Sequence, residues 1–114
     1  LCRTLKWDKY SEEHAFLLSI DSRHRLKAFF EIGIGSRCEC VVDNCSIAQK
    51  VLLSNAYIMI MVHNHPSGDP TPSEEDQNVS NELKKLGELL GIPFVDSIIL
   101  GDGVYKSFAE EGIL

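Results

Sequence analysis

One apolar segment that ends in two histidines constrains the fold of this chain most. The run Tyr57–Val62 has the length and composition of a buried β-strand, and it continues directly into His63, Asn64, His65 and Pro66. Residues i and i+2 of an extended chain point to the same side, so His63 and His65 can direct both imidazoles at one point. The proline then ends the strand. The sequence therefore predicts a buried strand whose end carries a pair of imidazoles.

A stiff loop and a helix follow this strand. Pro66, Pro70 and Pro72 lie close together in the loop and restrict its backbone. Ser73 has the residue type of a helix N-cap. Apolar residues recur at helical spacing behind it: Val79, Leu83, Leu86 and Leu90. This pattern places Asp76 in the first turn of a predicted helix.

These side chains have the composition of a metal site. Two neutral imidazoles and a carboxylate, from His63, His65 and Asp76, suit zinc, and three protein ligands leave the fourth tetrahedral position open for water, as in catalytic sites. Taken alone, Ser73-x-x-Asp76 is also close to a helix capping box without chemistry, and a lone histidine at a strand end is more often hydrogen-bonded than metal-bound. The joint pattern favours a site for about one zinc ion per chain.

The whole motif resembles that of the JAMM (MPN-type) metalloproteases. Their motif has an upstream Glu, then His-x-His-Pro, then Ser-x-x-Asp, with the same spacing as His65 to Ser73 here. The segment His63–Gly68 most resembles the sequences of the bacterial RadC-like branch. Further matches are Leu18–Asp21, Arg25, Glu31-x-Gly33, Leu90–Ile92, Val95–Ile99 and Ser107–Gly112. The resemblance covers the chain from about Tyr10 onward, and residues 1–114 are predicted to form a single RadC-like domain.

The spacing of hydrophobic residues predicts the strands and helices of the chain. Strands are predicted near residues 14–21, 26–33, 39–42, 57–63 and 94–100, with a short one near 104–107, and helices near 45–54 and 73–90. The resemblance implies that they form a three-layer α/β fold of the cytidine-deaminase type, with a mixed sheet and helices on both faces. Deaminase chemistry itself is not expected, because the His-x-Glu and Pro-Cys-x-x-Cys elements of deaminases are missing.

Glu31 is the predicted general acid/base. One face of its predicted strand is apolar and comprises Leu26, Ala28, Phe30 and Ile32. Glu31 points to the other face, and its position just before Gly33, as in the family, favours a carboxylate over the metal-bound water. The alternative is a solvated Glu on an exposed strand face. Glu39 is the second candidate for the acid/base, and Ser73 is predicted to donate a hydrogen bond to the oxyanion.

The resemblance implies a zinc-dependent hydrolase that cleaves a peptide or isopeptide bond of a peptide or protein substrate. Two alternatives stay open. One is a nucleic-acid maintenance protein, because RadC-like proteins have traditionally been described as DNA repair proteins. The other is a metal-binding interaction module without turnover. An exposed strand edge would also allow a homodimer.

One position departs from the family. RadC-like chains usually carry Asp-His where this chain has Asp96-Ser97. This position is not one of the motif's metal ligands, so the departure concerns substrate handling or a contact behind the ligands.

The charge of the chain argues against strong non-specific nucleic-acid binding. The formal net charge is -6, and only Lys84 and Lys85 are adjacent among the basic residues. Proteins that bind DNA through its phosphates normally carry a basic stripe. We therefore expect DNA affinity to be weak and to disappear at physiological salt, as measured by a binding titration at increasing salt. A nanomolar dissociation constant at physiological salt would favour the DNA-repair alternative.

Composition sets the remaining expectations. With 114 residues, 44% of them hydrophobic, the chain can form one compact domain with its own core. Its apolar runs are far shorter than the about 20 residues of a membrane span, and no signal pattern opens the chain, so a cytoplasmic protein is expected. The first residue is Leu1 rather than Met, so the sequence is compatible with a segment that precedes it.

Three of the four cysteines lie close together: Cys38, Cys40 and Cys45. A structural zinc site needs four ligands, so free thiols are expected here rather than a zinc site or disulfides.

Overall fold

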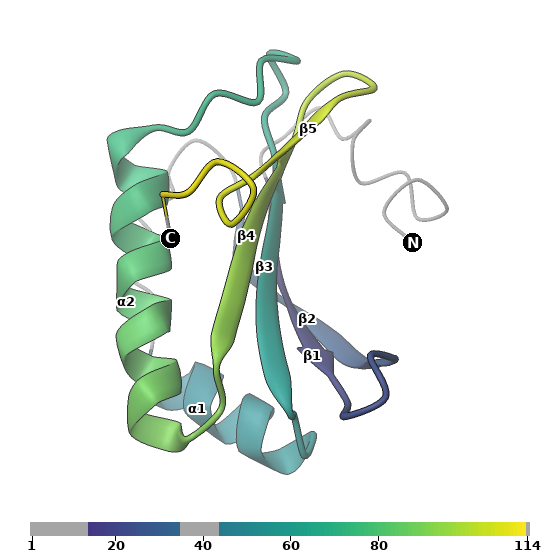
Figure 1. Cartoon of the computed structure of the whole chain (residues 1–114), viewed down its shortest axis with the longest axis vertical. Coiled ribbons are helices and arrows are strands. Elements are labelled where there is room, and N and C mark those ends of the chain that lie inside the picture. Colours follow the sequence, from purple (N-terminus) through teal and green to yellow (C-terminus); the bar gives the residue numbers. More distant parts are fainter. Residues whose placement is uncertain (1–13, 35–43, 114) are drawn as a thin grey trace.

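The computed structural model describes residues 14–34 and 44–113. Figure 1 shows the elements in chain order: β1 (His14–Ile20), β2 (Leu26–Ile34), α1 (Asn44–Leu53), β3 (Ile58–Asn64), α2 (Glu74–Leu90), β4 (Phe94–Leu100) and β5 (Tyr105–Ser107). The strand predicted near residues 39–42 lies outside the described residues, as do Glu39, Cys38 and Cys40. The side chain of Cys45 is not described either.

The described strands form one mixed sheet in the order β2-β1-β3-β4-β5. β1 pairs antiparallel with both β2 and β3, β3 pairs parallel with β4, and β4 pairs antiparallel with β5. Parallel neighbours need a crossover connection, and α2 provides it between β3 and β4. This connection starts at the end of β3, where the two histidines of the motif lie, so the loop and the start of α2 return over that end.

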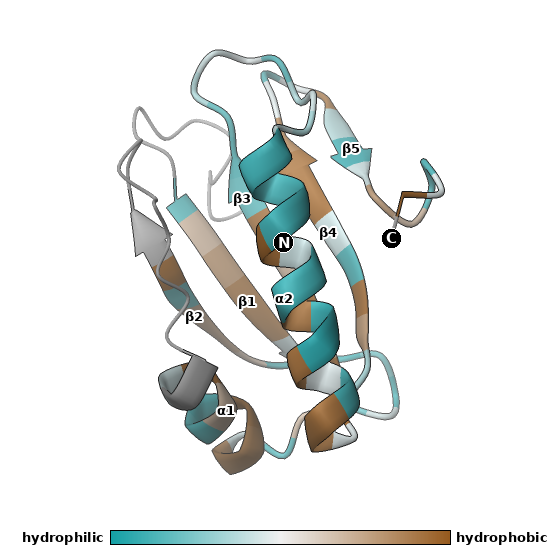
Figure 2. Cartoon of the chain, turned by 90° about the vertical axis from the view of Figure 1, so that its left-hand side faces the viewer, coloured by the Kyte–Doolittle hydropathy of each residue, from teal (hydrophilic) through white to brown (hydrophobic). Residues whose placement is uncertain are grey.

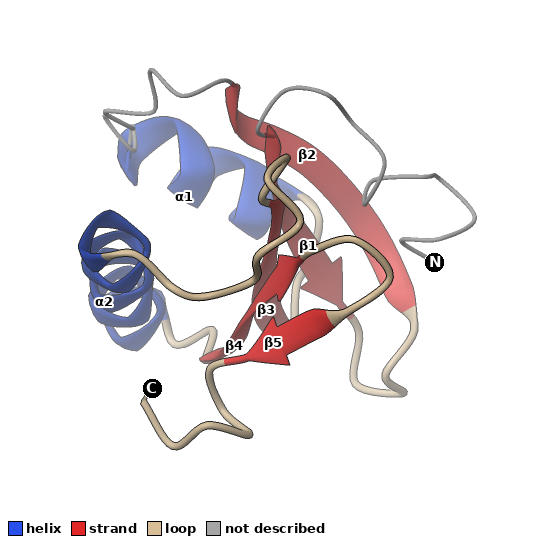
Figure 3. Cartoon of the chain, turned by 90° about the horizontal axis from the view of Figure 1, so that it is seen from above, coloured by secondary structure: helices blue, strands red, loops and turns tan. Residues whose placement is uncertain are grey.

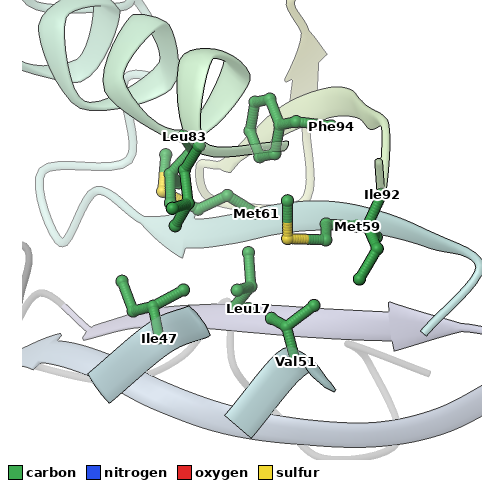
Figure 4. Packing of buried hydrophobic residues seen from close by; sticks show 9 residues of the cluster. Leu17, Ile47, Val51, Met59, Met61, Leu83, Ile92 and Phe94 are labelled. Atoms are coloured by element: carbon green, nitrogen blue, oxygen red, sulfur yellow. The ribbon is translucent and has the colours of Figure 1, made fainter. Parts of the chain in front are cut away.

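Both described helices pack on the same face of the sheet (Figure 3). Their apolar stripes share one cluster with residues of the sheet: Leu17, Ile47, Val51, Met59, Met61, Leu83, Leu86, Ile92 and Phe94. Figure 4 shows Leu83 of α2 and Ile47 and Val51 of α1 directed into this cluster. The prediction of helices on both faces is therefore wrong for the described residues, which form two layers. The physical reason is that the stripes of α1 and α2 are buried against the same side chains of β1 and β3.

The opposite face of the sheet carries a second apolar cluster, built on Phe16, Leu18, Val62 and Leu100. Leu26 also packs there, although the alternation of β2 predicted it beside Phe30 and Ile32, which face the helices. The pairing of β1 with β2 shifts by one residue between Ser19 and Ile20. Such a bulge adds one residue to a strand and turns the residues beyond it to the other face.

The two ends of α2 are fixed by small residues and caps. Ser73 is the N-cap, and Gly91 ends the helix in the left-handed conformation with φ 74°. A Cβ at Gly87 would lie 2.5 Å from the carbonyl oxygen of Ile92 and 3.1 Å from the nitrogen of Phe94, so only glycine allows this close approach to the start of β4. The outward side of α2 is mainly hydrophilic (Figure 2). Neither described helix is long and apolar enough to cross a bilayer.

Candidate metal centre

Three side chains converge where β3 ends and α2 begins. The Nε2 atoms of His63 and His65 lie 3.2 Å apart. The Asp76 carboxylate places Oδ1 3.1 Å from Nε2 of His63 and Oδ2 3.1 Å from Nε2 of His65. Among the described residues this is the group of His, Cys, Asp and Glu side chains whose ligand atoms could hold a metal ion. The structure thus brings together the three ligands that the motif predicts.

The spacing of these atoms fits a single divalent ion. Ligands that lie about 2.0–2.1 Å from a tetrahedral zinc are separated from one another by roughly 3.3–3.4 Å. The two Nε2 atoms lie 3.2 Å apart, and each lies 3.1 Å from a different oxygen of Asp76, so a rotation of the carboxylate would bring one oxygen to both imidazoles. Two imidazoles and one carboxylate also suit other divalent transition metals. The donor set and its geometry therefore fit a metal ion without fixing which one.

His65 is held in the tautomer that a metal ligand needs. Its Nδ1–H donates to the carbonyl oxygen of Asp69 at 2.9 Å, which leaves the lone pair of Nε2 directed into the cluster. Its backbone N–H donates to the carbonyl oxygen of Leu100 at 2.8 Å, beyond the last pair of β3 with β4. The ring and the backbone of His65 are thus both fixed.

Asp76 serves the helix and the cluster together. Its Oδ2 accepts the backbone N–H of Ser73 at 2.8 Å, while Ser73 Oγ accepts the backbone N–H of Asp76 at 3.1 Å, which completes a capping box. The two interpretations of Ser73-x-x-Asp76, helix cap and metal ligand, are therefore compatible. Ser73 is exposed, and its hydroxyl keeps a proton to donate while Oγ accepts. Its role as an oxyanion donor stays a prediction.

The surroundings of Asp76 keep it ionised. Burial opposes the charged form, but the hydrogen bond that Nε2 of His63 donates to the carboxylate outweighs burial and holds the pKa of Asp76 well below its usual range. The backbone N–H of Ser73 acts in the same direction. A carboxylate that stays charged at neutral pH is ready to bind a cation.

Glu31 lies on the other side of the sheet from this cluster. Glu31 pairs with Phe16, whereas His63 pairs with Ala15, and neighbouring residues of β1 point to opposite faces. The Oε2 atom of Glu31 lies 3.2 Å from Nδ1 of His14. The structure therefore gives Glu31 a histidine partner and does not bring its carboxylate to the metal cluster. Its role as the general acid/base stays a prediction.

Asn64, between the two histidines, has a structural role that its sequence position alone did not reveal. Its side chain is 3% exposed, and its Oδ1 accepts the backbone N–H of His14 at 2.6 Å. Strand alternation turns Asn64 away from its neighbours, and a buried amide needs a partner. That rule predicts some contact for Asn64, but not that the partner lies 50 positions away in the chain. The bond ties the first residue of β1 to the strand end that carries the ligands.

Ser97, where the resemblance predicts a histidine, is completely buried in β4. It pairs with Met61, so it shares the face of the sheet that also carries His63. The departure from the family therefore changes a buried position behind the ligands rather than a surface that substrate could touch.

Two glycines hold the loop after His65 against the turn between β4 and β5. The backbone N–H of Asp102 donates to the carbonyl oxygen of Gly68 at 3.2 Å. A Cβ at Gly101 would collide with that same oxygen. We expect Gly101→Ala to displace the loop, to destabilise the fold by roughly 1–3 kcal/mol, and to weaken metal binding.

Thermal unfolding and a zinc titration measure the two effects of Gly101→Ala. Gly103→Ala is the matched control, because Gly103 has φ +71° but a Cβ there meets nothing within 4 Å. This control should lower the melting temperature through backbone strain alone and leave zinc affinity unchanged. Equal zinc affinity in Gly101→Ala and the control would contradict the role of the loop contact.

The chain also resembles known proteins over nearly its whole length. It matches the RadC-like JAB domain family over residues 1–113. A UPF0758 protein of Pelobacter propionicus is 39% identical over 102 residues, which cover 90% of this chain and 44% of the relative. A UPF0758 protein of Clostridium tetani is 39% identical over 110 residues, which cover 96% of this chain and 47% of the relative. The chain spans less than half the length of these relatives. The predicted resemblance is confirmed, and the chain belongs to the RadC-like JAB domain family.

Proposed function

We propose that this domain is a zinc-dependent hydrolase that cleaves a peptide or isopeptide bond. The observation that carries the proposal is the convergence of His63, His65 and the Asp76 carboxylate at separations that fit one divalent ion. Membership of the JAB family supports a hydrolytic role for such a group. Three protein ligands leave one tetrahedral position open, as in catalytic rather than structural zinc sites.

A bound zinc ion would act as a Lewis acid and lower the pKa of its water from that of bulk water towards about 7. The chain's own residues would prepare the site for that chemistry. The Asp69 carbonyl keeps the Nε2 lone pair of His65 directed at the ion, and the ionised Asp76 supplies the negative ligand. The exposed hydroxyl of Ser73 is proposed to donate to the oxyanion, and such a donor typically contributes about 3 kcal/mol.

We propose Glu31 as the group that accepts the proton of the attacking water. Two observations support it. Glu31 lies at the same end of the sheet as the cluster, one register position from the pair of Ala15 with His63. Its carboxylate contacts His14, whose backbone is bonded to Asn64 between the two ligands. The carboxylate faces away from the cluster in this structure. Catalysis by Glu31 therefore requires the end of β2 to move so that the carboxylate passes round the end of the strands to the face that carries His63.

The function is tested with purified protein freed of metal and then titrated with zinc. We expect about one zinc per chain and zinc-dependent cleavage within a panel of unstructured peptides and isopeptide-linked peptides. A chain that binds zinc and cleaves none of them would favour the interaction module without turnover. A chain that binds no zinc would refute the metal centre itself.

A further inference from the structure

Three buried polar atoms of the described residues have no hydrogen-bond partner: Nδ1 of His63, Oγ of Ser80 and Oγ of Ser97. Their residues are 4%, 1% and 0% exposed. A buried polar group without a partner costs about 1–3 kcal/mol, so folded proteins rarely leave one unpaired. Three such atoms call for a partner, and a shared one requires that they lie near one another.

Strand register places Ser97 diagonally behind His63. In the parallel pairing of β3 with β4, His63 lies beside Ile99 and Met61 lies beside Ser97. Paired residues share a face, and so do residues two apart in a strand. His63 and Ser97 are thus diagonal neighbours on the face that the helices cover, at a Cα separation of roughly 7–8 Å.

The pitch of α2 places Ser80 at the same height along the sheet as Ser97. Ser80 follows Asp76 by one helical turn and so lies on the same side of the helix, about 6 Å further along it. The helix runs down the sheet, since Asp76 contacts His63 at one end and Gly87 lies against Met59 at the other. Met61, which pairs with Ser97, lies two residues from His63, and two strand residues span about 6.6 Å. One helical turn from Asp76 towards Gly87 therefore reaches the position of Ser97 along the sheet. Ser80 therefore faces the sheet near the position of Ser97.

We infer that Ser97 and Ser80 hold one buried water that hydrogen-bonds Nδ1 of His63. A buried water typically makes about three hydrogen bonds, and here it would make one with Nδ1 of His63 and one with each serine hydroxyl. Two hydrogen bonds of about 2.8 Å each let such a water join atoms that lie roughly 5 Å apart, which suits diagonal neighbours.

In the metal-free protein Nε2 of His63 donates to Asp76, so Nδ1 accepts a hydrogen bond from the water. When Nε2 binds the proposed ion, Nδ1 carries the proton and the water accepts it, as the Asp69 carbonyl does for His65. Ser97 and Ser80 are then positioning residues that act through His63 rather than catalytic residues. The effect on metal affinity rests on the proposed function, whereas the hydrogen bond between the water and Nδ1 of His63 does not.

The first test is nitrogen-15 NMR of the histidine rings in the metal-free protein at a pH where they are neutral. We expect His63 as the Nε2–H tautomer, with an Nδ1 resonance at the position of a ring nitrogen that accepts a hydrogen bond. Ser97→Ala and Ser80→Ala should each move that resonance towards the position of a nitrogen without a hydrogen bond. They should also weaken zinc affinity by roughly 10-fold, at the lower end of what contacts behind a ligand contribute.

Ser19→Ala is the matched control. Ser19 is a fully buried strand serine on the sheet that also carries His63, but it pairs with Met59 near the opposite end, and its Oγ bonds Ser54 Oγ at 2.9 Å. Its loss should lower the melting temperature and leave the Nδ1 resonance of His63 and the zinc dissociation constant unchanged. This control separates a structural cost from an effect on the ligand.

Each outcome decides the inference. An Nδ1 resonance of His63 without a hydrogen bond in the unaltered protein overturns it, whether or not zinc binds. Zinc affinity and an Nδ1 resonance in Ser97→Ala and Ser80→Ala that match Ser19→Ala also overturn it. If the hydrogen-bonded resonance and its dependence on both serines are observed but no zinc binds, the inference holds and the proposed function fails. Should Ser97→Ala not fold, Ser80→Ala and the Nδ1 resonance of the unaltered protein decide the question.

Discussion

Replacing His63 and His65 together with alanine should leave a protein that retains no zinc. The pair supplies two of the three ligands, and the remaining Asp76 carboxylate cannot hold the ion alone. Elemental analysis after dialysis against metal-free buffer measures the effect, with about one zinc per chain expected in the unaltered protein. Any zinc-dependent hydrolysis should disappear with the metal.

His24→Ala is the control for the loss of a histidine. His24 is exposed in the turn between β1 and β2, outside the group that could hold a metal. Its zinc content should equal that of the unaltered protein. Full zinc occupancy in the double variant would show that the ion is held elsewhere and would remove the basis of the proposed function.

Glu31→Gln should lower the rate of hydrolysis by roughly 10²–10⁴-fold while zinc content and melting temperature barely change. The amide cannot accept the proton of the water, but it keeps the shape of the side chain and an oxygen that can face Nδ1 of His14. Binding of substrate should survive and turnover should not. Single-turnover rates with zinc-loaded protein give the measurement.

Glu88→Gln is the matched control, because Glu88 is exposed on α2 and should not affect the rate. A rate within a few-fold of the unaltered protein in Glu31→Gln would mean that the arrangement with Glu31 beside His14 is also the working one. Glu39→Gln would then be the next variant to test. The comparison therefore decides whether Glu31 acts as the general base, as its position in the family motif predicts, or only contacts His14, as in this structure.

Elements with strong local signals could be predicted closely from the sequence. The helix predicted near residues 73–90 is Glu74–Leu90, and the strand near 94–100 is Phe94–Leu100. Ser73 starts the helix and Gly91 ends it, so local chemistry defines both boundaries. The convergence of His63 with Asp76 was predictable for the same reason, because a strand end, a short stiff loop and a helix start are consecutive in the chain.

Features that depend on distant contacts could not be predicted in this way. The position of Leu26 and the contact of Glu31 with His14 depend on how β2 pairs with β1, and that pairing shifts register at both of its ends. Strand alternation assigns faces correctly only between such shifts. The placement of both helices on one face likewise depends on tertiary packing, since an apolar stripe shows that a helix is buried but not which face of the sheet it covers.

The double use of Asp76 links the lifetime of a bound ion to the fraying of a helix. The Asp76 carboxylate closes the first turn of α2 through Ser73 and also faces both imidazoles, so opening of that turn and release of one ligand are the same event. Helix ends open more readily than helix centres. An ion that binds only the closed turn would slow its opening, and the strength of the cap would in turn set how fast the ion could leave. The kinetic lability of the metal would then be a property of the helix terminus as much as of the ligands.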